Sequence, residues 1–166
     1  MECDFEVNVF SNGRDRLIKV YGSLGYDASA VLFEIFRRGV KPALYVVDLT
    51  NVNAMSSAGL ATLIRGYHCL RPNYLVIENE VVYEWRKQYS LGSIPFVQTK
   101  EHLEKRLSEE RSTVFKNAAA FLRVPLEELV SSTTKKKKRK IKKATRLFHN
   151  SSKNLYYTES YINSLI

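Results

Sequence analysis

The most constraining feature of the sequence is a continuous apolar run at residues 43–49 (ALYVVDL). A strand that is apolar at nearly every position is buried on both faces, which is typical of the centre of a sheet covered by helices. Residues 74–77 (YLVI) form a second run of this kind, and an amphipathic helical pattern separates the two. Together they predict an α/β domain in which helices connect parallel strands.

The first part of the chain predicts a hairpin. Residues 5–10 alternate apolar and polar, Asn12-Gly13 follows, and residues 17–21 form the return strand, with Gly22 as its expected end. Asp27 is the expected N-cap of the first helix.

The later part of the chain predicts alternating helices and strands. Leu60, Leu63, Ile64 and Tyr67 recur at helical spacing on one face of a second helix. A third helix begins near Val81, a short strand covers residues 96–98, and one long helix is expected over residues 101–122. The expected order is therefore β-β-α-β-α-β-α-β-α.

Charge divides the chain into two parts. The formal net charge is +9, yet residues 1–122 carry about +1 and residues 123–166 about +8. We therefore expect a domain over residues 1–122 and a basic, flexible C-terminal extension over residues 123–166, with residues 131–134 as a polar linker.

The segment from Asp48 to Leu60 is the most informative for function. It is polar, it joins a predicted buried strand to a helix, and it ends in Ser56-Ser57-Ala58-Gly59. Ser57 is expected to cap the helix, and the small residues after it are expected to leave the first helical turn open. A serine at a helix N-terminus is usually a cap, but a phosphate on it would also be partly compensated by the helix dipole. Asp48 fits a structural and a functional role equally.

At these residues the chain resembles the STAS domain, the module of anti-sigma factor antagonists and of sulphate transporter tails. The resemblance covers about residues 17–107. It rests on Val46-Val47-Asp48-Leu49, on Ser56-Ser57-Ala58-Gly59-Leu60 and on the closing pattern of residues 91–103 (LGSIPFVQTKEHL). It implies a small α/β sandwich in which helices pack on a mixed, mostly parallel sheet.

The resemblance also implies a site. In the antagonist branch a cognate kinase phosphorylates a serine that matches Ser57, and Ser56 stands where an acidic residue often precedes it. Ser57 is thus the candidate phosphorylation site and Ser56 a minor one. The expected partner contacts are Asn53, Met55, Ser56, Ser57, Ala58 and Gly59.

The mechanism implied is a partner switch. Unmodified protein would bind an anti-sigma factor or a serine kinase-like protein and free the sigma factor, and phosphate on Ser57 would break that contact. A cytoplasmic regulator follows, because the acidic N-terminus lacks the apolar segment of a secretory signal.

The sequence carries no catalytic motif. His68, His102 and His149 lack partners at metal-ligand spacing, and Cys3 and Cys69 lack the spacing of a zinc site. No nucleophile elbow, P-loop or dinucleotide-binding motif occurs. We therefore expect a non-catalytic binding module without a metal or cofactor, although some STAS domains bind nucleotides.

The extension contains eight basic residues within residues 135–143. A solvated tail, phosphate contacts with RNA or DNA, and attachment to an anionic membrane surface all fit such a run. The last two leave open a STAS accessory subunit of a membrane transporter, peripheral to the inner face of the membrane, and a nucleic-acid-associated protein. The candidate phosphate or membrane contacts are Lys135, Lys136, Lys137, Lys138, Arg139, Lys140, Lys142 and Lys143.

Overall fold

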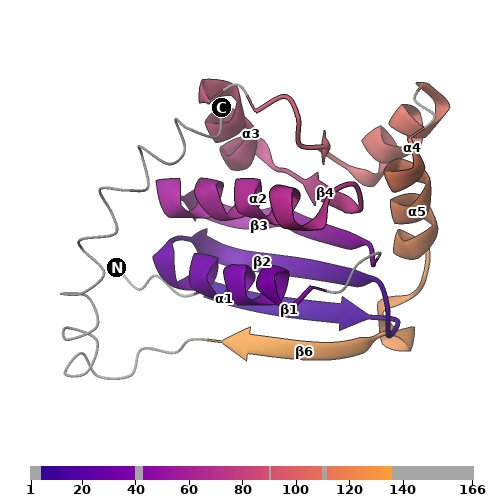
Figure 1. Ribbon diagram of the computed structural model, residues 1–166, viewed down its shortest axis with the longest axis horizontal. Helices are drawn as coiled ribbons and strands as arrows, with labels where there is room; N and C mark the ends of the chain where they lie inside the picture. Colours follow the sequence, from indigo (N-terminus) through magenta and orange to yellow (C-terminus); the bar gives the residue numbers. More distant parts are fainter. Residues whose placement is uncertain (1–4, 40–42, 90, 110–111, 136–166) are drawn as a thin grey trace.

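The computed structural model describes residues 5–39, 43–89, 91–109 and 112–135 (Figure 1). The strands are β1 (Phe5–Ser11), β2 (Arg16–Leu24), β3 (Tyr45–Met55), β4 (Tyr74–Ile77), β5 (Phe96–Val97) and β6 (Val130–Lys135). The helices are α1 (Tyr26–Arg37), α2 (Ser57–Leu70), α3 (Glu80–Gln88), α4 (Lys100–Glu109) and α5 (Thr113–Leu122), followed by a 3-10 turn at Leu126–Glu128.

The strands form one sheet in the order β5-β4-β3-β2-β1-β6. Strands β2, β3, β4 and β5 run parallel, whereas β1 is antiparallel to both β2 and β6. The prediction of an α/β fold with a mixed, mostly parallel sheet is confirmed.

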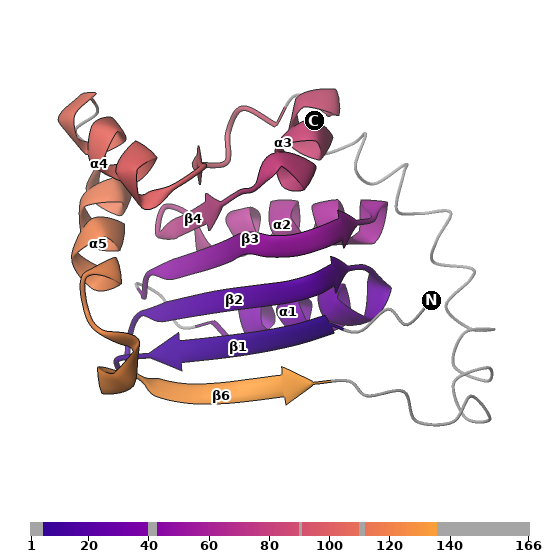
Figure 2. The ribbon, with the colours of Figure 1, turned by 180° about the vertical axis from the view of Figure 1, so that it is seen from behind.

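Two hydrophobic clusters lie on opposite faces of this sheet. Helices α1, α2 and α3 pack on one face, where Ile18, Val47 and Leu63 are buried. Helices α4 and α5 contribute Leu103 and Phe115 to the other face, over Val46 and its neighbours. Seen from behind, β1, β2 and most of β3 stand in front of α1 and α2 with no described helix over them (Figure 2).

The predicted hairpin is confirmed. Asn12 Oδ1 accepts hydrogen bonds from the backbone N–H groups of Arg14 (3.0 Å) and Asp15 (2.8 Å), and Gly13 has a φ of +94°. The predicted end of the second strand at Gly22 is wrong. Gly22 has a φ of +81° and lies beside an irregularity in the β2–β3 pairing, so that β2 bends there and continues to Leu24. Its lack of a Cβ makes this bend accessible without steric strain.

Helix α1 begins at Tyr26 with Gly25 as its N-cap, so the prediction that Asp27 caps it is wrong. Ser29 Oγ donates a 2.6 Å hydrogen bond to the Gly25 carbonyl oxygen instead. Asp27 lies in the first turn, where a carboxylate interacts favourably with the helix dipole.

Strand β3 is longer than the apolar run that predicted it. Residues 50–55 were expected to turn, but they continue the strand and pair with β2, for example Gly22 with Val52 and Leu24 with Met55. Thr50, Asn51 and Asn53 are exposed although they lie in the strand, so polar residues here do not mark a turn.

The expected long helix over residues 101–122 is two helices, α4 and α5. Residues 108–113 (SEERST) are all polar and interrupt the apolar stripe. Ser112, the N-cap of α5, has an extended backbone (φ −80°, ψ 126°), so the helix is not continuous over residues 101–122.

Residues 131–134 are not a linker. They lie in β6, which pairs antiparallel with β1 from Ser11–Val130 to Glu6–Lys135. The sheet of the predicted domain therefore takes its outermost strand from the part of the chain beyond residue 122.

Candidate functional site

The candidate site lies at the carboxyl edge of the parallel strands. Strands β2, β3 and β4 end there, and α1, α2 and α3 begin there (Figure 1). This edge is where open α/β sheets commonly bind ligands, because loops and helix N-termini converge on it. The Ser56-Ser57 pair is located at this edge, between β3 and α2.

Ser56, and not Ser57, caps α2. Its Oγ accepts a hydrogen bond from the backbone N–H of Gly59 (3.3 Å), and its carbonyl accepts one from the N–H of Leu60 (3.1 Å). The Ser56 N–H also donates to the Leu24 carbonyl oxygen (3.2 Å), which ties the start of α2 to the end of β2. The prediction that Ser57 is the cap is therefore wrong by one residue.

Ser57 is the first residue of α2 and is half-buried. Its hydroxyl makes no hydrogen bond to any part of the chain that the structure describes. The first turn of α2 contains no acidic residue. A negative group on Ser57 would thus meet unpaired N–H donors and no like charge within that turn.

Gly59 has a packing role. It is buried, and a Cβ built on it would overlap the Leu24 carbonyl oxygen and lie 2.9 Å from Leu24 Cγ. The expectation that Gly59 leaves the helix mouth open is wrong, since α2 uses it to approach β2 closely.

The accessible part of this edge is formed by other residues. Asn53 and Ala54 are exposed at the end of β3, and Met55 and Ala58 are half-buried around Ser57. Tyr26, which is 41% exposed, begins α1 on the same edge. Leu24 at the end of β2 pairs with Met55 at the end of β3. Tyr26 comes two residues after Leu24 and Ser57 comes two residues after Met55, so both lie just beyond the paired ends of the two strands. Sequence reasoning missed Tyr26, because its place beside the serines depends on the pairing of β2 with β3.

A polar network supports the end of β3. Asp48 is buried, accepts hydrogen bonds from Thr50 N (3.0 Å) and Thr50 Oγ1 (2.6 Å), and lies 3.5 Å from Lys19 Nζ. Asn79 Nδ2 donates to the Val52 carbonyl oxygen (2.6 Å), while Asn79 Oδ1 caps α3 by accepting from Val82 N (3.1 Å). These contacts give Asp48 a structural role.

A buried ion pair lies beside this network. Both oxygens of Glu78, a side chain 1% exposed, accept hydrogen bonds from Arg86, at 2.8 Å from Nε and 2.7 Å from Nη2. The guanidinium lies over the rings of Tyr83 and Phe96, and its hydrogen bonds to Glu78 raise the pKa of Arg86. The sequence did not predict this pair. Glu78 follows a strand and Arg86 lies eight residues later in a helix, and no sequence motif has this spacing.

The structure describes two of the three histidines in the sequence. His102 Nδ1 accepts a hydrogen bond from the Gln98 N–H (3.2 Å) at the start of α4, His68 is exposed near the end of α2, and His149 lies outside the described residues. Within the described ranges no three His, Cys, Asp or Glu side chains gather in a way that could hold a metal ion. None of the helices described there is long and apolar enough to cross a membrane.

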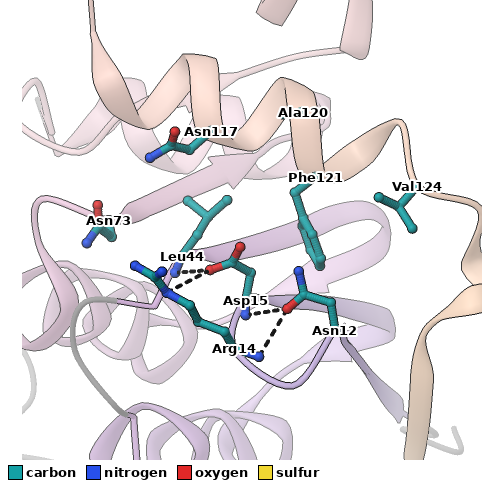
Figure 3. A pocket seen from close by; sticks show the side chains of 9 residues that line it. All are labelled: Asn12, Arg14, Asp15, Leu44, Asn73, Asn117, Ala120, Phe121 and Val124. Atoms are coloured by element: carbon teal, nitrogen blue, oxygen red, sulfur yellow. Dashed lines mark hydrogen bonds and ion pairs between the residues drawn. The ribbon is translucent and has the colours of Figure 1, made fainter.

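A cavity of about 430 Å³ opens at the opposite, amino-terminal edge of the parallel strands (Figure 3). Its polar wall comes from the hairpin, where Asp15 Oδ1 accepts a 3.0 Å hydrogen bond from the Leu44 N–H. Asn117 and Phe121 of α5 form the facing wall. Asn12 and Asp15 are thus engaged in holding the hairpin against the start of β3, and the cavity is separate from the serine pair.

The basic candidates fall mostly beyond the described chain. Lys135 ends β6, and the other candidates lie outside the described residues, namely Lys136, Lys137, Lys138, Arg139, Lys140, Lys142 and Lys143.

Comparison with known proteins assigns no family to this arrangement. No protein-family model matches the chain, and no curated protein matches it either.

Proposed function

We propose that this chain is a non-catalytic regulatory binding module that works as a STAS-type partner switch. Its carboxyl edge, formed by Asn53, Met55, Ser57 and Ala58 with Tyr26 beside them, binds an anti-sigma factor or a serine kinase-like protein. Phosphorylation of Ser57 releases that partner.

The observation that supports the proposal is that the two serines have different hydrogen-bonding roles. Ser56 Oγ is occupied as the cap of α2, whereas the half-buried Ser57 hydroxyl has no hydrogen bond within the described chain. Modification of Ser57 therefore leaves the cap of α2 in place.

The departure from the family pattern at Ser56 fits this arrangement. Serine and aspartate are comparable N-caps, so Ser56 does the capping that an acidic residue would do at that position. It does so without a negative charge next to Ser57, and the first turn of α2 can accept a phosphate of about −1.5 to −2 charge.

The same phosphate would act against a bound partner. An unpaired charge at the centre of an interface costs several kcal/mol, and each ~1.4 kcal/mol weakens binding about tenfold. A micromolar complex would therefore dissociate when Ser57 is modified.

The test is a parallel pull-down from native extract with wild type, Ser57→Asp and Ser93→Asp, followed by mass spectrometry of partners and bait. Ser93 is exposed before β5, so Ser93→Asp adds the same charge away from the edge. We expect an anti-sigma factor or kinase-like partner with wild type and Ser93→Asp, its loss with Ser57→Asp, and phosphate on Ser57. Identical partners for all three baits, with no phosphate on either serine, would refute the switch.

A further inference from the structure

Strand β6 is an open edge of the sheet. It is the last strand in the order, and among the described strands it pairs with β1 alone. No described element lies beyond it in either view (Figures 1 and 2). Its outer side therefore presents backbone N–H and C=O groups without a strand to pair with, which is a template for another strand.

Residues 130–134 lack the features that usually block such an edge. They contain no proline and no charged side chain, and their pairing with β1 proceeds one residue at a time without a bulge. Ser131, Ser132, Thr133 and Thr134 are all exposed. The strand is regularly paired, uncharged and exposed over this length.

Exposed apolar side chains also gather here. Three large hydrophobic side chains are exposed within the described ranges. Two of them lie near β6, namely Leu126 (38%) in the 3-10 turn before it and Val130 (76%) as its first residue. Contiguous exposed apolar surface often marks an interaction site.

The charges around β6 are self-complementary. Exposed Glu127 and Glu128 precede the strand, and the basic run that begins at Lys135 follows it directly. When two copies of such a strand pair antiparallel about a two-fold axis, the acidic end of each meets the basic end of the other.

We propose that β6 pairs antiparallel with β6 of a second copy of this chain, so that one continuous sheet runs through a symmetric dimer. A pairing centred on Ser132, which then faces its own copy across the two-fold axis, sets Val130 against Thr134 of the partner subunit. In the sequence an acidic pair precedes β6 and a basic run follows it, so charges of opposite sign flank each end of the strand pair. This surface is remote in sequence from Ser57, and the dimer does not depend on the partner switch.

The test is the mass of the full chain in solution, measured by sedimentation equilibrium over a range of protein concentrations and at low and high salt. The monomer is 19.1 kDa, so the dimer has twice that mass. We expect a dimer at low salt that weakens as salt rises, because part of the attraction is between accessible charges. A monomer at every concentration at low salt would overturn the proposal.

Charge variants identify the surface. Glu127→Lys with Glu128→Lys should weaken the dimer at least about tenfold, since like charges then meet at both ends of the strand pair. Glu80→Lys with Glu84→Lys makes the same change of net charge on exposed positions of α3 and should leave the dimer unchanged. Adding Lys136→Glu and Lys137→Glu to the first variant should restore it.

A strand variant tests the backbone pairing. Successive residues of β6 direct their N–H groups alternately toward β1 and toward the open side, so one of Ser132→Pro and Thr133→Pro removes a donor from the open edge and should give a monomer. Far-UV circular dichroism and thermal melting check that each variant is folded. A dimer that is insensitive to both proline variants, or to the Glu127 and Glu128 changes relative to their control, would place the interface elsewhere and overturn the assignment to β6.

Discussion

Removing Arg86 is expected to destabilise the protein strongly, because it leaves the Glu78 carboxylate buried without its counter-charge. Glu78 is 1% exposed and both of its oxygens are bonded to the guanidinium. Breaking a buried pair from one side costs about 3–5 kcal/mol. The Arg86 side chain is 27% exposed, so water reaches part of the site and we expect Arg86→Met to cost about 2–4 kcal/mol.

A surface ion pair supplies the matched control. Arg123 Nη2 lies 3.1 Å from Glu104 Oε1, but the two side chains are 69% and 56% exposed. Such pairs contribute about 0–1 kcal/mol, so Arg123→Met should have little effect. The two substitutions remove the same group from bonds of similar length, and they differ in the burial of the carboxylate left behind.

The assay is urea unfolding followed by circular dichroism and by fluorescence of the single tryptophan, Trp85 of α3, which stacks on Tyr89 directly after that helix. The double variant Glu78→Leu/Arg86→Met should recover much of the lost free energy of unfolding. It removes the unpaired buried carboxylate and fills the site with apolar groups. An Arg86→Met variant as stable as Arg123→Met, or additive effects in the double variant, would refute the reasoning.

Three further variants test the supports of the site, each measured by thermal or urea unfolding. Gly59→Ala should destabilise the protein, because overpacking against Leu24 costs about 1–3 kcal/mol and exceeds the ~1 kcal/mol that alanine gains over glycine in a helix. Gly92→Ala is the control and should change stability little, since no atom lies within 4 Å of the new Cβ. Asn79→Ala should cost about 2 kcal/mol by removing both the cap of α3 and the bonds to β3, and Asn79→Asp, which keeps only the cap, should fall between it and wild type. Tyr74→Phe should leave stability unchanged or raise it by about 1 kcal/mol, since the buried Tyr74 hydroxyl has no hydrogen-bond partner in the described chain; a clear loss would contradict this.

Local patterns in the sequence predicted the elements that bury a recognisable face. The strand expected at residues 74–77 coincides with β4, and the Asn12-Gly13 hairpin and the apolar stripe of α2 are present as expected. In each case the signal is the period at which apolar side chains recur, or a turn whose backbone conformation favours particular residues, and both are encoded within a few neighbouring positions.

The sites of interest depended on less local information. The sequence shows two serines before a helix but not which of them caps it. The hydrogen bond from the Ser56 N–H to the Leu24 carbonyl oxygen fixes the end of β3 beside β2 and so sets where α2 begins. Tyr26 lies on the same edge as the two serines because β2 pairs with β3. Glu78 contacts Arg86 because α3 packs back against the end of β4.

Strand β6 shows the limit most clearly. Its Ser-Ser-Thr-Thr stretch resembles a linker in composition, and the alternation that marks a half-buried strand is absent. Its place in the sheet comes from backbone hydrogen bonds to β1 at the far end of the chain. The sequence by itself determined the order of helices and strands up to β5 and the buried faces, because side-chain hydrophobicity carries that information. The tertiary structure decided the sheet edge, the cap and the buried ion pair, because backbone pairing and the meeting of distant residues have no local pattern.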